Sequence, residues 1–112
     1  SARTQEFKYA NYMSEWVKKV ERVGNLNYPD EARRAGLSGK LIMDVTMNAD
    51  GTVRNISIMR PSGHKVIDEA ATRIVNLAAP FPPFPEEILK EADIMHITRT
   101  WEFSTTNRLQ SH

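Results

Sequence analysis

Three polar side chains near the middle of the sequence have the types needed for hydrolytic catalysis. Ser62, His64 and Asp68 lie close together, and a serine, a histidine and an aspartate are the parts of a catalytic triad. They also stand where a helix is expected to begin, and there a serine caps the first turn while an aspartate complements the helix dipole. We therefore expect Ser62 or Gly63 to cap a helix and no hydrolytic site to form.

Metal and cofactor sites are also not expected. The chain has no cysteine, and His64, His96 and His112 lack the spacing of metal ligands. The segment 48–51 has the sequence Asn-Ala-Asp-Gly, but it lacks the further carboxylates of a calcium loop and is better explained as a hairpin turn. The sequence contains no glycine-rich phosphate loop. We expect no catalytic residue, no metal and no cofactor.

The composition indicates one ordinary folded domain over residues 1–112. Of 112 residues, 40% are hydrophobic and 26% are charged, which is typical of a globular chain. The 15 basic and 14 acidic side chains give a net charge of +1. Proteins that bind nucleic acid normally carry a basic excess, so we do not expect a nucleic-acid partner.

Apolar residues recur at helical spacing over residues 8–23, which predicts an N-terminal helix that ends at Gly24 and Asn25. Its aromatic and apolar stripe is expected to dock on the core of the same chain, or else to pair with the same helix of a second chain in a homodimer. A short helix is predicted over 29–35 and another over 64–78. The stripe consists of Tyr9, Tyr12, Met13, Trp16, Val17, Val20 and Val23.

Alternating residues predict three strands, over about 40–47, 52–59 and 94–103, with a bulge near Asn55. The fold class is therefore α+β, with a small three-stranded antiparallel sheet packed by helices. The proline-rich run 80–85 is expected to be an extended connection that buries Phe81 and Phe84. The core is expected over 28–104, followed by a frayed polar tail over 105–112.

The last predicted strand must pair on one side with the hairpin and leave its other side exposed. An exposed strand edge presents unpaired N–H and C=O groups, which can accept an extended peptide. Composition does not distinguish such a binding edge from one that is merely protected. Trp101 on this strand is expected to pack on the 64–78 helix. Arg99, on the same face, is expected to lie at the margin of the sheet or to extend its charged end out to solvent.

Motifs in order along residues 28–103 resemble the C-terminal domain of TonB energy transducers. They begin with Tyr28-Pro29, and they include the Asp50-Gly51 turn, the proline-rich run 80–85 and Trp101-x-Phe103. The remaining motifs are Ala32-Arg33 with Gly36, Gly39-x-Leu41-x-Met43-x-Val45, Val53, Ser62-Gly63 and Ile67-Asp68-x-Ala70-Ala71. The helix predicted over 8–23 is similar to an extra N-terminal helix found in a subgroup of this family.

The resemblance implies a binding module and not an enzyme. A parent protein would be anchored in the inner membrane of a Gram-negative bacterium and driven by an ExbB–ExbD complex. Its periplasmic C-terminal domain would bind the TonB box of outer-membrane transporters, as in iron–siderophore uptake, by adding that segment to the strand from Asp93 to Phe103. The residues that this implies for partner binding are Asn25, Leu26, Asn27, Ile94, His96, Thr98, Thr100 and Glu102.

A second class of function is an envelope-bridging domain. It could be a TolA-like C-terminal domain, or a TonB-type protein that serves secretion, motility or envelope integrity. A TolA-like domain normally carries a disulfide, and the lack of cysteine counts against it.

Overall fold

The computed structural model describes residues 2–112, and the side chains of residues 7–112. Four helices and a four-stranded antiparallel sheet with the order β2-β1-β3-β4 make up the fold, which confirms the predicted α+β class. The elements are α1 (Ala2–Leu26), α2 (Asp30–Ala35), β1 (Gly39–Asn48), β2 (Val53–Arg60), α3 (Lys65–Ala78), α4 (Glu86–Leu89), β3 (Ile94–Phe103) and β4 (Leu109–Ser111).

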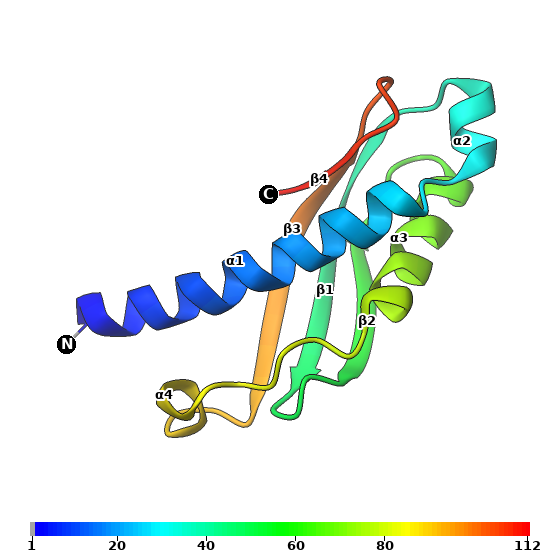
Figure 1. Ribbon diagram of the computed structural model, residues 1–112. Coiled ribbons are helices and arrows are strands. Elements are labelled where there is room, and N and C mark those ends of the chain that lie inside the picture. The colour runs from blue at the N-terminus through cyan, green and yellow to red at the C-terminus, as the bar shows by residue number, and fades with distance from the viewer. Residues whose placement is uncertain (1) are drawn as a thin grey trace.

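Both long helices cover the same face of the sheet. In Figure 1, α1 crosses in front of β3 and β1, and α3 lies on that same side, over β2. The side chains of β1 and β3 alternate, so every second residue points toward these helices, and most of these residues are buried. The core formed there includes Leu41, Met43, Val45, Met47, Ile67, Ala71, Ile74, Val75, Ile97, Trp101 and Phe103.

The predicted aromatic stripe of α1 docks on the core of its own chain. Tyr12, Trp16 and Val20 are buried. Trp16 stacks on Phe81 with ring centroids 5.0 Å apart, and Tyr12 meets Phe84 edge-on at 5.4 Å. Within residues 2–112 no helix, α1 included, is apolar over enough of its length to cross a bilayer.

Gly24 does not end α1, so the predicted helix boundary is wrong. The helix continues to Leu26, and Gly24 is buried within it. A Cβ atom at this position would overlap Leu109 and lie 3.3 Å from Ile74 Cγ2. Gly24 therefore lets α1 approach both β4 and α3 closely, at the cost of helix propensity.

The hairpin turn and the proline-rich run support each other. Gly51 has a φ of +90°, and a Cβ there would collide with the carbonyl of Phe81. The Phe81 N–H donates to the Gly51 carbonyl at 2.8 Å, and Phe81 and Phe84 are both buried, as predicted. The expected bulge also forms, because the register moves from Thr46↔Asn55 to Met47↔Val53 and leaves Arg54 unpaired.

The predictions of a frayed tail and of a three-stranded sheet are wrong, because the tail contains a fourth strand, β4. The chain turns after Ser104 and returns beside β3, pairing Phe103 with Leu109 and Trp101 with Ser111. Leu109 is buried against the core. Residues 105–112 therefore contain the fourth strand of the sheet.

Candidate functional site

The outer edge of β3 has two halves: one is hydrogen-bonded to the C-terminal segment, and the other has no neighbouring strand within residues 2–112. The N–H of Thr100 donates to the His112 carbonyl at 2.9 Å, and that of Ser104 donates to Arg108 at 3.0 Å, so the even-numbered residues face away from β1. In the described part of the chain, no strand pairs with β3 on this edge before Thr100. The outward N–H and C=O groups of Ile94, His96 and Thr98 therefore form an open edge.

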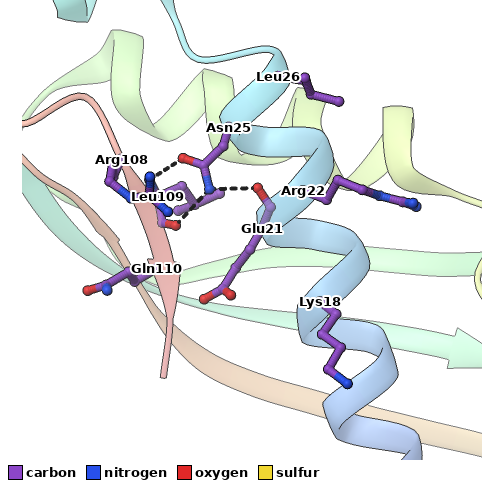
Figure 2. Close-up of a pocket in the computed structure, with 8 residues that line it drawn as sticks. All are labelled: Lys18, Glu21, Arg22, Asn25, Leu26, Arg108, Leu109 and Gln110. Atoms are coloured by element: carbon purple, nitrogen blue, oxygen red, sulfur yellow. Dashed lines mark hydrogen bonds between the residues drawn. The ribbon is translucent and has the colours of Figure 1, made fainter.

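The outer edge of β4, by contrast, is closed by side chains. Figure 2 shows the amide of Asn25, near the end of α1, aligned with the Leu109 backbone. Its Oδ1 accepts the Leu109 N–H at 2.9 Å and its Nδ2 donates to the Leu109 carbonyl at 3.2 Å. A carboxylate oxygen of Glu21 accepts the Ser111 N–H at 2.9 Å. Asn25 and Glu21 thus occupy the positions that another strand would need.

Arg99 completes the closure of β4. It lies on the helix-covered face, and its guanidinium donates to Ser111 Oγ at 3.0 Å and to the Ser111 carbonyl at 3.1 Å. The Arg99 side chain thus extends from β3 to the end of β4, which confirms its predicted place at the margin of the sheet. Strand addition to β4 would require several of these bonds to break.

The face of the sheet away from the helices carries a polar cluster beside the open edge. Thr98 Oγ1 donates to Asp44 Oδ1 at 2.7 Å, and His96 Nδ1 lies 3.0 Å from Asp44 Oδ2. The Asp44 side chain is 14% exposed and that of His96 is 67% exposed. Burial opposes ionisation of Asp44, but the hydrogen bonds from His96 and Thr98 outweigh it and hold the pKa of the carboxyl below its usual range. These hydrogen bonds hold the side chains of His96 and Thr98, on β3, against Asp44 of β1.

The residues predicted to bind a partner at the end of α1 have three different environments. Asn25 is engaged with Leu109, and the Asn27 amide donates back to the Val23 carbonyl at 2.8 Å. Leu26 is 79% exposed and makes the end of α1 apolar at the surface. Of the three, Leu26 is an exposed apolar side chain with no polar group to engage.

These residues do not lie beside the open edge of β3. Asn25 contacts Leu109, which pairs with Phe103 at the far end of β3 from Ile94. The ends of this ten-residue strand are roughly 30 Å apart. A partner that touched both regions would have to extend along the whole strand.

A shallow groove lies between the last turns of α1 and β4, beside Leu26 (Figure 2). It has a volume of about 510 Å³. Its charged side chains are mostly basic, which favours contact with carboxylates of a partner. The lining residues are Lys18, Glu21, Arg22, Asn25, Leu26, Arg108, Leu109 and Gln110.

Ser62, His64 and Asp68 come together as parts of a turn and not as a triad. The Ser62 hydroxyl bonds to the His64 backbone, and the Asp68 carboxylate accepts the Ser62 N–H at 2.9 Å. The helix N-cap is His64, so the prediction of Ser62 or Gly63 as the cap is wrong. Among the described residues, no group of three histidine, aspartate or glutamate side chains is placed to hold a metal ion.

Comparison with known proteins gives the family. Residues 24–105 match the family described as the C-terminal region of the Gram-negative bacterial TonB protein. The chain belongs to the TonB C-terminal family. Two curated relatives, the TonB proteins of Helicobacter pylori strains ATCC 700392/26695 and J99, are 33% and 32% identical over 60 residues. Those residues are 54% of this chain but 21% of either relative, so the match covers about a fifth of their length.

The fold is also that of a TonB C-terminal domain. One solution structure of the Helicobacter pylori TonB C-terminal domain matches with a TM-score of 0.59 and 25% identity over 80% of each chain. A second matches with a TM-score of 0.54 and 27% identity, over 70% of this chain and 78% of the other. The segment that matches the TonB family profile excludes most of α1 and all of β4.

Sequence reasoning on this TonB domain missed the closure of the β4 edge, although it had named Asn25 as a partner-binding residue. The bonded pairs Asn25–Leu109 and Glu21–Ser111 are 84 and 90 positions apart in sequence, and none of the four residues belongs to a motif. The one available signal was Leu109, an apolar residue in a polar tail. Thr100 and Glu102, which are predicted to bind a partner, pair with His112 and Gln110 in this structure.

Proposed function

We propose that this domain is the periplasmic, partner-binding end of a TonB energy transducer. It binds the TonB box of outer-membrane transporters as an added strand and passes on energy derived from the proton gradient. The parent is anchored in the inner membrane and driven by an ExbB–ExbD complex. Family membership supports the general role, and the open edge of β3 from Ile94 to Thr98 is the observation that carries the binding mode.

The open part of β3 is better suited to a bound strand than the other edges of the sheet. On β4 the outward backbone groups are already bonded to Asn25, Glu21 and Arg99. On β2 the pairing with β1 is interrupted twice, leaving Arg54 and Met59 as extra residues. Bulges twist a strand and disturb further pairing, and an exposed arginine discourages it. The Ile94–Thr98 stretch has neither feature.

The binding surface proposed here is shorter than the sequence implied. Ile94, His96 and Thr98 offer free backbone groups, whereas Thr100 and Glu102 are covered by β4. A bound strand of about five residues fits beside Ile94–Thr98 with β4 in place. Contact by Leu26, at the other end of β3, requires a second part of the transporter.

We further propose that the domain acts by binding and not by catalysis. The Ser62 hydroxyl and the Asp68 carboxylate are both hydrogen-bonded to backbone atoms at the start of α3. The sheet edge needs no reactive group, because main-chain hydrogen bonds supply the affinity and side-chain packing supplies the specificity.

Replacing Thr98 by proline tests strand addition. Proline removes the outward N–H, and its ring blocks an approaching backbone, while the inward bonds of Ile97 and Arg99 to β1 remain. We expect the affinity for a TonB-box peptide to fall by about tenfold or more, measured by calorimetry. The matched control is Thr98→Val, which also loses the hydroxyl bond to Asp44 but keeps the N–H.

The control variant should bind nearly as tightly as the natural chain. Thr98→Pro with unchanged affinity would overturn strand addition at this edge. Thr100→Pro is expected to act differently, because it removes the bond to His112 and so loosens β4.

A further inference from the structure

One row of side chains on α1 joins the β4 end of the sheet to the segment just before β3. Residues four apart on a helix form a continuous ridge. Figure 1 shows the N-terminal half of α1 extending past β3, on the side away from β1. The ridge consists of Tyr9, Met13, Val17, Glu21 and Asn25.

The two ends of this ridge are fixed to the sheet by hydrogen bonds. At the C-terminal end, Asn25 and Glu21 bond to the β4 backbone as described above. At the other end, the Tyr9 hydroxyl donates to Glu91 Oε2 at 3.1 Å, three residues before β3 begins. The ridge therefore spans from β4 to the start of β3.

The middle of the ridge changes from polar to apolar. Glu21 and Asn25 meet the backbone of β4, whereas Met13 and Val17 are only partly buried at the border of the core. Met95, on the helix-covered face of β3, is also partly buried against the core. Met13 and Val17 thus lie on α1 between the residues bonded to β4 and Tyr9, which is bonded just before β3.

We propose that Met13 and Val17 form, with Met95, an apolar ceiling over the peptide site and select the side chains of the bound strand. This inference rests on strand addition to β3 as proposed above. The occupant is an extended segment of a partner protein, because the free N–H and C=O groups of His96 and Thr98 require a backbone opposite them.

The pleat of the sheet fixes the pattern that this ceiling selects. Residues directly opposite each other on neighbouring strands point to the same face. Bound residues opposite Met95 and Ile97 therefore face α1 and must be apolar. The residue opposite His96 faces the polar cluster around Asp44, where a polar side chain is accepted. The selected pattern is apolar–polar–apolar.

A charge placed in the ceiling tests this inference. Met13→Asp is compared with Ser14→Asp, which puts the same charge on the exposed side of α1 one residue away. The probe is the TonB-box peptide used with Thr98→Pro. We expect Met13→Asp to weaken binding by about tenfold or more, because a carboxylate would be desolvated against apolar side chains. Ser14→Asp should bind as the natural chain does.

Two further measurements keep the test decisive. Met13→Leu should retain binding, and Met13→Ala should weaken it if the aspartate variant does not fold. An aspartate scan of the peptide should find two sensitive positions separated by one tolerant position.

Equal affinities for Met13→Asp and Ser14→Asp, or tolerance at every peptide position, would overturn the ceiling. If Thr98→Pro still abolishes binding in that case, strand addition stands without it. If Thr98→Pro also binds normally, strand addition itself has failed.

Discussion

Replacing Trp101 by alanine will lower the free energy of unfolding by about 3–5 kcal/mol. Trp101 is completely buried in β3, between Leu41 of β1 and Ser111 of β4 in the ladder. Its indole N–H has no acceptor among the described residues, so the loss measures packing and the cavity that remains. Urea denaturation gives the difference, and Glu102→Ala, on the opposite face, is the control.

Trp101 lies in the half of β3 that pairs with β4, next to the open half, so the size of this effect bears on the site. A loss below about 1 kcal/mol would contradict the core position, since removing a buried tryptophan leaves a large cavity. The remaining tryptophan, Trp16, allows the transition to be followed by fluorescence in the variant.

Deleting residues 1–23 should lower stability by several kcal/mol. The deletion removes Tyr12, Trp16 and Val20 from the core and leaves Phe81 and Phe84 without their aromatic partners. It also removes Glu21, which holds Ser111. Chemical denaturation and sedimentation of the shortened and full chains measure stability and oligomeric state together.

The two measurements separate the possible roles of α1. Docking within one chain predicts a large loss of stability in a full chain that is a monomer. A shortened chain that is monomeric and unfolds like a dimeric full chain would instead show that α1 is a dimerisation element.

Residues with a regular burial period could be assigned to elements from the sequence. The stripe of α1 repeats every three or four residues, and the alternation of β1 and β3 repeats every two, because one side of each element is buried. The end of α1 was mispredicted at Gly24. Glycine is normally a signal that a helix ends. Here glycine is needed within the helix, because Leu109 and Ile74 pack too closely to leave room for a side chain.

The fourth strand could not be found in this way. Three residues are too few to show a period, and β4 is held largely by tertiary bonds from Asn25, Glu21 and Arg99. The sequence predicted that all of β3 is an edge strand, which is wrong for the half from Thr100 onward that pairs with β4. That division depends on how far β4 extends along β3.

Amide hydrogen exchange in the presence of a TonB-box peptide tests the proposed binding mode most directly. Strand addition at the open edge slows exchange at His96 and Thr98, whose N–H groups point outward, and leaves Met95 and Ile97, already bonded to β1, unchanged. This alternation along β3 is the expected result. Slowing along Val53–Arg60 of β2, or binding with no change at His96 and Thr98, would show that the peptide does not add to β3.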